Sequence, residues 1–368
     1  MKRYSHITGW GMVVPERILT NEEITQTVDT TDEWIRTRTG VQERRIAAED
    51  ETTASLASGA ALKALTMAGI KPSQVDMIIV STSSPEHTFP STASIVQDEI
   101  GAIKAGAFDL SAACTGFIYA LDMVSHAITS GSIDIALVIG AETLSKIVNW
   151  KDRNTCILFG DGAGAFVLQA LDKPGGFISS VLRSDGSGAD LLTLPAGGSK
   201  LPASEQTVRD GLHYIHMQGR EVFRFATRVM AKATLETVEK GGLTLDDISL
   251  IIPHQANQRI IESAAKKLKL PMDKFFVNLD KYGNTSTASI PIATCEAVEA
   301  DALQPGDMIV FVGFGGGLTW GSALIQWSGP QLEVKPIRTG WYQFWAGIRS
   351  FLLKILRRIE GLLSGLGE

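Results

Sequence analysis

Residues 75–80 read Val-Asp-Met-Ile-Ile-Val, and residues 248–253, 173 positions further on, read Ile-Ser-Leu-Ile-Ile-Pro. The same offset of 173 separates DIALVIG at 134–140 from DMIVFVG at 307–313, and Gly69 from Gly242. Short, continuous apolar runs of this kind are typical of strands that are covered on both faces. Two strands and a helix-ending glycine that share one offset indicate an ancestral duplication.

Helical and strand patterns alternate around these repeats, which is typical of an α/β protein. The first half predicts helix 53–69, strand 75–82, strand 105–110, helix 116–130 and strands at 134–140, 156–159 and after 164. The second half predicts helix 220–240, strand 248–253, helix 255–268 and strands 307–313 and 319–327. Segment 171–219, rich in Gly, Ser, Pro and Asp, is predicted to be a loop-rich connection. We therefore expect a five-layered α-β-α-β-α fold with pseudo-two-fold symmetry, its halves at 1–172 and 173–330.

The composition of the chain excludes several classes of protein. A chain of 368 residues with 44% hydrophobic and 20% charged residues has a large core and is not disordered. The net charge of −6 argues against a general nucleic-acid binder. The three cysteines have no metal-ligand spacing, so we expect no metal site and no disulfide framework. Because there is no signal-peptide pattern and no run of about 18 uncharged apolar residues, we expect a cytoplasmic protein.

Cys114 is the candidate nucleophile. It lies in SAACTGF at 111–117, between a predicted strand and a predicted helix. At the N-terminus of a helix the macrodipole favours a thiolate, and backbone N–H groups can bind a developing oxyanion. The alternative is a small buried apolar residue. That alternative is the better interpretation of Cys156 and Cys295, which lie in apolar surroundings.

A nucleophilic cysteine needs a partner, and two residues qualify by position. His254 follows the apolar strand 248–253, and Asn284 lies in YGNTSTAS at 282–289, a turn before a helix. Asn284 alone could equally be a helix N-cap. The other five histidines have no chemical context. The FGDGAG stretch at 159–164 lacks the pattern of a phosphate loop, so close backbone packing is the preferred explanation.

Together these motifs resemble the β-ketoacyl-acyl-carrier-protein synthase III family, the initiating condensing enzymes of type II fatty-acid synthesis. The resemblance covers residues 1–328 and rests on TDEWIRTRTG at 31–40, ACTGF at 113–117, FGDGAG at 159–164, PHQAN at 253–257, YGNTS at 282–286 and GFGGGLTWG at 313–321. It implies a thiolase-like fold, which is the duplicated architecture expected above. It also implies an acyltransferase that needs CoA thioesters as substrates and no metal or redox cofactor.

The resemblance assigns roles by position. Cys114 would take the acyl group of acyl-CoA, acetyl-CoA by default, as a thioester. His254 and Asn284 would promote decarboxylation of malonyl-acyl-carrier protein by stabilising the enolate oxygen. The backbone N–H groups of Cys114 and Gly316 would form a second oxyanion hole. The product would be 3-oxoacyl-carrier protein, with release of CO₂ and CoA.

The resemblance also implies binding residues. The CoA contacts would be Thr30, Trp34, Arg38, Arg153, Gly219 and Asn257, with the adenine held between Trp34 and Arg153. The acidic carrier protein would meet Gln255, Ala256, Asn257, Gln258, Arg259 and Arg224. Phe89 and Phe314 would belong to the acyl pocket. Because family dimers lend the counterpart of Phe89 to the partner's pocket, a homodimer is expected.

The C-terminal tail departs from the family. At 100° per residue, apolar side chains between Trp341 and Leu363 fall within an arc of about 140°. Residues 331–368 carry six Lys/Arg and three Glu, a net charge of +3, which leaves −9 on residues 1–330. A cationic amphipathic helix with Trp and Phe on its apolar face is typical of a membrane-surface helix. We expect segment 338–363 either to touch the inner face of the membrane or to dock on the body or on a dimer partner.

Three alternatives remain open. A CoA-only condensing enzyme of the same fold, resembling type III polyketide synthases, also uses Cys, His and Asn. A hydroxymethylglutaryl-CoA synthase needs a glutamate base near the cysteine, for which Glu86 and Glu99 are weak candidates. A non-catalytic thiolase-fold scaffold would not need Cys114, His254 and Asn284 together.

Overall fold

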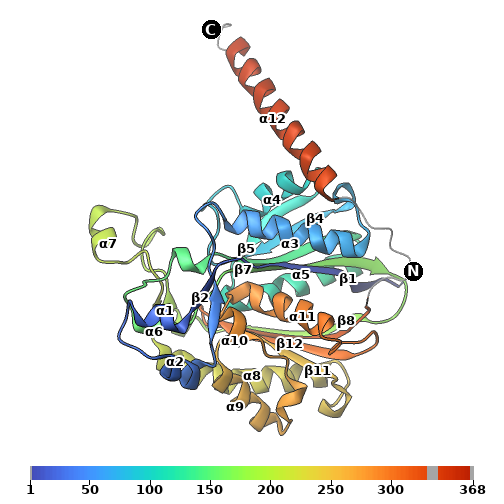
Figure 1. The fold of residues 1–368 in the computed structure, drawn as a ribbon. Helices are drawn as coiled ribbons and strands as arrows, with labels where there is room; N and C mark the ends of the chain where they lie inside the picture. The colour runs from blue at the N-terminus through green and yellow to red at the C-terminus, as the bar shows by residue number, and fades with distance from the viewer. Residues whose placement is uncertain (1, 330–338, 365–368) are drawn as a thin grey trace.

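The computed structural model describes residues 2–329 and 339–364. Two sheets lie at its centre (Figure 1). The first has the order β1-β7-β6-β4-β5, formed by Tyr4–Val13, Gly162–Leu171, Ile135–Glu142, Met77–Ser81 and Gly106–Leu110. The second has the order β11-β12-β13-β8, formed by Leu250–Pro253, Met308–Gly315, Thr319–Gln326 and Gly176–Ser184. The proposed boundary at 172/173 falls between β7 and β8.

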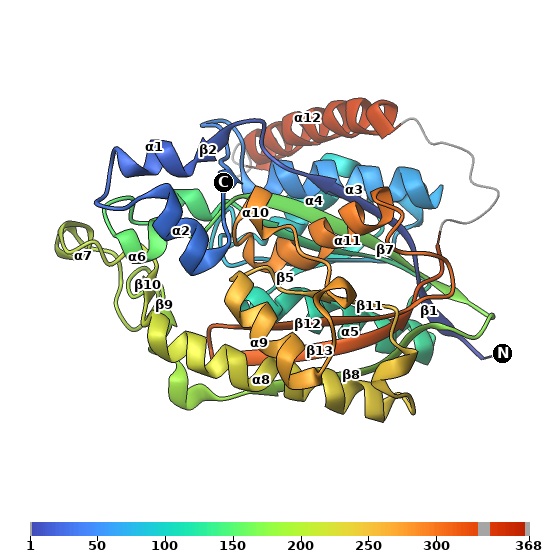
Figure 2. The same cartoon turned by 60° about the horizontal axis from the view of Figure 1, so that its bottom comes forward.

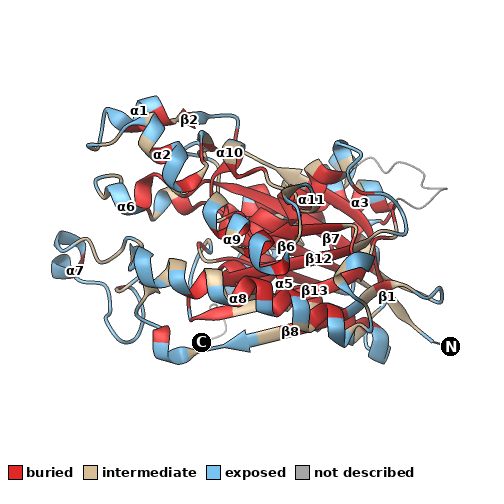
Figure 3. Cartoon of the chain, turned by 90° about the horizontal axis from the view of Figure 1, so that it is seen from below, coloured by how far each residue is buried: buried red, intermediate tan, exposed pale blue. Residues whose placement is uncertain are grey.

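Helices cover both sheets and fill the space between them, as seen from two directions (Figures 1 and 2). α3 (Thr53–Ala68) and α4 (Thr92–Ile100) cover the outer face of the first sheet, and α8 (Gly219–Lys240) and α9 (Gln258–Leu268) cover that of the second. α5 (Gly116–Ser130) and α11 (Ser289–Glu299) lie between the sheets. Burial is concentrated in the sheets and these middle helices (Figure 3). The expected five-layered architecture is confirmed.

The duplication extends to single residues. β6 and β12 begin at 135 and 308 and end at 142 and 315, so both ends keep the offset of 173. The short 3₁₀ turns η2 (Ala113–Thr115) and η7 (Ser286–Ala288), and the helices α5 and α11 that follow them, begin at the same offset. The two 3₁₀ turns lie against each other between the sheets. The repeat therefore places two equivalent strand-to-helix turns face to face.

One predicted strand was wrong and one strand was missed. Segment 171–219 is loop-rich, as predicted, but it contains β8, which pairs with β13 as the edge strand of the second sheet. An edge strand with one polar face does not show the continuous apolar run that identified the central strands. Cys156 ends the short helix α6 (Arg153–Cys156) instead of starting a strand. Cys156 and Cys295 are both buried, as predicted.

The FGDGAG stretch packs closely against the second half. A Cβ at Gly160 would overlap the carbonyl oxygen of Tyr282, and one at Gly164 would lie 2.7 Å from Pro291 Cβ. β7 begins at Gly162 and continues as a buried strand. The packing interpretation of this motif is confirmed.

Shorter elements complete the described chain. They are β2 Ile18–Thr20, α1 Asn21–Thr25, α2 Asp32–Thr39, β3 Glu43–Arg45, β9 Leu192–Thr193, α7 Glu205–Arg209, β10 His216–Met217 and α10 Leu279–Tyr282. α12 (Thr339–Ser364) packs on α4 and bears out the predicted C-terminal helix, although 330–338 lie outside the described residues. Within the described ranges, no helix combines the length and apolarity needed to cross a bilayer.

Candidate active site

Cys114 occupies the 3₁₀ turn that joins β5 to α5. The residue before it, Ala113, has φ +47°, and its counterpart in the other repeat, Ser286, has φ +46°. The left-handed region is unfavourable for a residue with a Cβ by roughly 1 kcal/mol or more. Strain stored at both equivalent turns, where they meet, is typical of a functional site.

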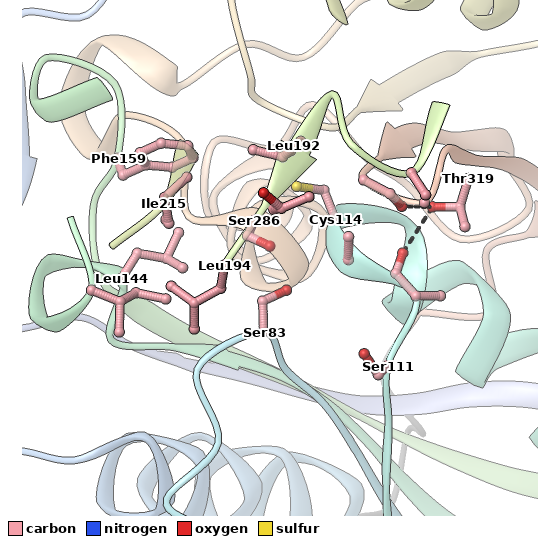
Figure 4. Close-up of a pocket in the computed structure, with 17 residues that line it drawn as sticks. Ser83, Ser111, Cys114, Leu144, Phe159, Leu192, Leu194, Ile215, Ser286 and Thr319 are labelled. Atoms are coloured by element: carbon pink, nitrogen blue, oxygen red, sulfur yellow. Dashed lines mark hydrogen bonds between the residues drawn. The ribbon is translucent and has the colours of Figure 1, made fainter. Parts of the chain in front are cut away.

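A cavity of about 370 Å³ opens beside Cys114 (Figure 4). Its polar side chains include Ser83, Ser111, Ser286 and Thr319, and Figure 4 shows Ser286 next to the Cys114 sulfur. The remaining wall is largely apolar and comes from separate loops and strands, with Leu144, Ile147, Phe159, Leu192, Leu194 and Ile215. A small apolar cavity that ends on a thiol can hold a short acyl chain.

The Cys114 side chain is buried, with 8% of the residue exposed. Burial raises the pKa of its thiol to about 12, and the negative charge of Glu142 adds to the rise while the Ser286 hydroxyl opposes it. Burial of the sulfur therefore works against the thiolate that the helix macrodipole favours.

His254 follows β11, and its backbone N–H donates to Val312 O at 2.8 Å. Its ring Nδ1 lies 3.1 Å from Ser289 Oγ, and Thr285 Oγ1 donates to the same Ser289 oxygen at 3.3 Å. When Ser289 accepts from Thr285 and donates its own proton to Nδ1, the neutral ring carries its proton on Nε2. Burial lowers the pKa of His254 to about 3, so the ring is neutral at physiological pH.

Asn284 has its amide fixed by its neighbours. Its Oδ1 accepts from the Ser286 backbone N–H at 2.8 Å, so Nδ2 is the end that remains to donate. Its backbone N–H donates to Leu158 O at 2.8 Å, which ties this turn to the first half. The geometry thus presents neutral N–H donors on both His254 and Asn284.

Close packing brings the three predicted residues into one neighbourhood. A Cβ at Gly313 would lie 3.5 Å from His254 Cβ and 3.8 Å from the carbonyl oxygen of Cys114. Asn284 is linked to the same region by Ser286. The backbone N–H of Ser286 donates to Asn284, and Ser286 lines the cavity together with Cys114. One cysteine from the first repeat thus lies at the meeting point of the two turns with a histidine and an asparagine from the second, although His254 and Asn284 are not among the residues that line the cavity.

The glycine-rich loop after β12 covers Cys114 from the other side. A Cβ at Gly315 would lie 2.7 Å from the Cys114 backbone nitrogen, and Gly316 lines the cavity. Thr319 Oγ1 lies 2.9 Å from Ala112 O and 3.1 Å from Gly316 O, contacts drawn as dashed lines in Figure 4. Thr319 therefore joins the cysteine turn to this loop, a link that the sequence analysis missed.

Glu142 was also missed. It ends β6 and is fully buried, and burial raises the pKa of its carboxyl group. Its oxygens accept from the Ser83 backbone N–H at 3.0 Å, Ser84 Oγ at 2.6 Å and Thr287 Oγ1 at 3.0 Å. The carboxyl group thus holds a first-half loop against η7. A charged residue that ends a fully apolar strand was the available signal.

A surface groove of about 590 Å³ holds most of the residues predicted to bind CoA and the carrier protein. Trp34, Arg38, Gly219, Asn257, Arg224 and Arg259 line it. Two guanidinium groups lie over the Trp34 ring, Arg153 at 4.9 Å and Arg38 at 5.7 Å from its centre. Thr30 precedes α2 and is not among the lining residues. Asn257 caps α9 and donates through Nδ2 to Arg38 O at 3.0 Å.

Two further expectations need correction. Gln255 is buried and bonds the backbone of Pro253, Phe276 and Asn278, so its side chain is not available to a carrier protein, whereas Ala256 and Gln258 are half-buried. Phe314 packs edge-on against His254 and does not line the cavity. Phe89 is 85% exposed in the single chain, so its predicted place in the acyl pocket of a dimer partner stays a prediction.

The chain matches two family models, described as "3-Oxoacyl-[acyl-carrier-protein (ACP)] synthase III" over residues 108–186 and as its C-terminal part over 238–327. A protein of Symbiobacterium thermophilum named beta-ketoacyl-[acyl-carrier-protein] synthase III is 56% identical over 321 residues, 87% of this chain and 97% of the relative. The 3-oxoacyl-[acyl-carrier-protein] synthase III of Aquifex aeolicus superposes with a TM-score of 0.81 at 46% identity, covering 88% of this chain and 100% of that one. The Thermus thermophilus enzyme gives 0.82 at 47%, covering 88% and 99%.

Proposed function

Because this chain belongs to the β-ketoacyl-[acyl-carrier-protein] synthase III family, we propose that Cys114, His254 and Asn284 catalyse its reaction. The enzyme is an acyltransferase that condenses an acyl-CoA primer with malonyl-acyl-carrier protein and so initiates fatty-acid synthesis. The products are 3-oxoacyl-carrier protein, CO₂ and CoA. The observation that supports these roles best is that the hydrogen-bond partners of His254 and Asn284 leave a neutral N–H donor free on each side chain, close to the turn that carries Cys114.

In the first step the Cys114 sulfur attacks the carbonyl carbon of acyl-CoA, and the bond between that carbon and the CoA sulfur breaks. The thiol proton ends on CoA, so the step needs no net base. We assign the N–H groups of Cys114 and Gly316 to the oxyanion of the tetrahedral intermediate. The close approach of Gly315 to the Cys114 nitrogen supports this assignment, because both N–H groups then lie at one end of the cavity.

In the second step malonyl-carrier protein loses CO₂, and negative charge develops on its thioester oxygen. His254 Nε2–H and Asn284 Nδ2–H donate to that oxygen. The carbanion then attacks the acyl-Cys114 carbonyl, and the Cys114 thiolate leaves and takes up a proton. Neutral donors suit this chemistry because they stabilise the enolate in the transition state without pairing strongly with the ground-state carboxylate. No metal or redox cofactor takes part in this scheme.

We assign the groove around Trp34 to the CoA nucleotide. Stacking between the Trp34 ring and the Arg153 guanidinium suits a purine, although a flat ring needs more than the present 4.9 Å and Arg153 must swing outward to admit it. Arg224 and Arg259 lie at the same groove and offer positive charge to an acidic carrier protein. Acetyl-CoA is the primer that we propose for a cavity of about 370 Å³.

We also propose a homodimer. β5 is an edge strand of the first sheet with Phe108 37% exposed, and Phe89 is 85% exposed. Pairing of two such edges would cover both side chains. For localisation we propose a cytoplasmic enzyme whose C-terminal helix contacts the inner face of the membrane, which the exposed apolar side chains of α12 support.

Intact-mass measurement after incubation with acetyl-CoA tests the assignment of Cys114. We expect an added acetyl group on the wild-type chain and none on Cys114→Ala. His254→Ala and Asn284→Ala should still be acylated but should decarboxylate malonyl-carrier protein 10²–10³-fold more slowly, about the loss expected for one oxyanion donor. Acylation of Cys114→Ala would refute the nucleophile. Turnover of malonyl-CoA as fast as malonyl-carrier protein would favour the CoA-only alternative.

A further inference from the structure

The C-terminal helix α12 packs on the body through small and polar residues. Ala346 is buried, with 5% exposed, and lies next to Gly101 at the end of α4. Arg349 Nη1 lies 3.5 Å from Asp98 Oδ1. Gln343 and Ser350 line the same groove between α4 and α12, together with Phe351 and Leu353 at its edge. The closest contacts of α12 with the body, at Ala346 and Arg349, therefore come from the side opposite most of its large apolar side chains.

The apolar side of α12 faces outward. At 100° per residue its large apolar side chains, apart from Leu353, lie within an arc of about 140°, on the side of the helix opposite Ala346. The exposed ones are Trp341, Phe344, Trp345, Phe351, Leu352, Ile355, Leu356, Ile359 and Leu362, from 38% to 70% exposed. A stripe of this size marks an interaction site. This arrangement is the reverse of an ordinary surface helix, whose apolar side packs on its own protein.

The net charge of α12 indicates which kind of surface binds its exposed apolar stripe. Residues 339–364 carry Arg349, Lys354, Arg357 and Arg358 against Glu360, a net charge of +3, whereas residues 1–330 carry −9. A cationic helix on an acidic body selects an anionic surface. A contact between the α12 helices of two copies would instead bring two segments of the same positive charge together. Tryptophan and phenylalanine near the start of the helix suit the boundary between headgroups and acyl chains.

We propose that α12 lies in the surface of an anionic bilayer, with its aromatic and aliphatic stripe among the acyl chains and its basic residues at the headgroups. This inference rests on the membrane contact proposed above and adds the inserted face, the lipid charge and the orientation of the enzyme. α12 starts beside α4 and projects outward from the end of the molecule that carries α3 and α4, whereas the groove around Trp34 lies by α2, α8 and α9 (Figure 1; compare Figure 2). The bound enzyme thus turns its CoA groove away from the lipid.

Vesicle co-sedimentation of the full chain tests the inserted face. We expect binding to phosphatidylcholine vesicles that contain about one-quarter phosphatidylglycerol, and little binding to phosphatidylcholine alone. Trp345→Ser with Leu352→Ser should lower the partition coefficient at least about 30-fold. The matched control, Gln343→Ser with Gly347→Ser, makes two changes to serine on the opposite side and should stay near wild type. Lys354→Gln with Arg358→Gln should lower binding to the anionic vesicles about 20-fold.

Equal binding by the two serine pairs would overturn the inserted face, and equal binding to both lipid compositions would overturn the anionic preference. Light scattering without lipid tests the rival occupant: if Trp345→Ser with Leu352→Ser lowers the oligomeric state, the stripe is an interface between copies and the proposal is wrong. Condensation by vesicle-bound enzyme should equal that of free enzyme, and a loss would refute the orientation. Cys114→Ala should bind vesicles normally, which separates this proposal from the catalytic one.

Discussion

Ser289→Ala tests whether the second half of the site depends on one hydroxyl group. Ser289 Oγ lies 3.1 Å from His254 Nδ1 and itself accepts from Thr285. The variant leaves Nδ1 of a buried ring without its donor, and the proton of the neutral ring can then move from Nε2 to Nδ1. In that tautomer Nε2 is an acceptor and cannot stabilise an enolate oxygen. Ser289 would thus be a positioning residue, which acts through His254.

Two estimates bound the expected fall in the decarboxylation rate of Ser289→Ala. Loss of one oxyanion donor costs about 10²–10³ in rate, which would apply if every ring changed tautomer. An unsatisfied buried polar group costs roughly 1–3 kcal/mol, and the lower half of that range corresponds to about 5- to 30-fold. We therefore expect decarboxylation of malonyl-carrier protein to fall about 10-fold. Acylation of Cys114 by acetyl-CoA should not change, because it does not use His254.

Each step is measured separately, acylation by intact mass and decarboxylation by CO₂ release. Thr294→Val is the matched control: Thr294 lies on the same helix, is buried and bonds only the Ile290 carbonyl oxygen at 2.8 Å. It should lower stability while leaving both rates intact. If Ser289→Ala decarboxylates at the wild-type rate, the hydroxyl does not set the tautomer. If it slows acylation equally, the damage is general and the reasoning also fails.

Three further predictions address other parts of the molecule. Trp34→Ala should raise the KM for acyl-CoA about 10-fold in steady-state assays while kcat changes little, because one stacking partner of a base is lost; an unchanged KM would remove Trp34 from the CoA site. Since burial lowers the pKa of His254 to about 3, the unfolded chain takes up a proton below pH 6.5 that the native chain does not. The free energy of unfolding should therefore decrease as the pH is lowered below 6.5, by about 2 kcal/mol at pH 5 from this residue. Urea titrations of His254→Gln should show a correspondingly smaller decrease. Gly140→Ala should destabilise by about 1–3 kcal/mol, because its Cβ would overlap the carbonyl oxygen of Thr287 beside η7, whereas Gly186→Ala, which meets nothing within 4 Å, should be neutral in thermal unfolding.

The sequence predicted what depends on local pattern. The strands at 77–81 and 308–315 were visible because burial on both faces demands continuous apolar runs. The cavity wall was not predictable in the same way. Leu192 and Ile215, for example, reach it from the segment between the halves, and no periodicity marks a side chain whose partner is distant in the chain.

The sequence does not show how deeply a polar group is buried. The position of Cys114 before a helix was predicted correctly, but the burial that raises the pKa of its thiol is determined only by the folded environment. Gln255 illustrates the same limit. It lies between His254 and a basic helix, yet three backbone partners hold its side chain inside the protein. Adjacency in sequence to an exposed arginine did not imply exposure.

The duplication explains why the site lies where it does. A pseudo-two-fold fold brings equivalent turns together, so η2 and η7 face each other whether or not they carry chemistry. Gly140 and Gly313 are also 173 residues apart, and each lies close to one of these turns. Gly140 packs against the carbonyl oxygen of Thr287 in η7, and Gly313 packs near the carbonyl oxygen of Cys114 in η2 and near His254 Cβ. Both repeats therefore keep the space, while only one carries a thiol and only the other carries the donors. Since the equivalent positions Ala113 and Ser286 share the same positive φ, we infer that this turn geometry belongs to the ancestral repeat, and that Cys114, His254 and Asn284 made the two turns different.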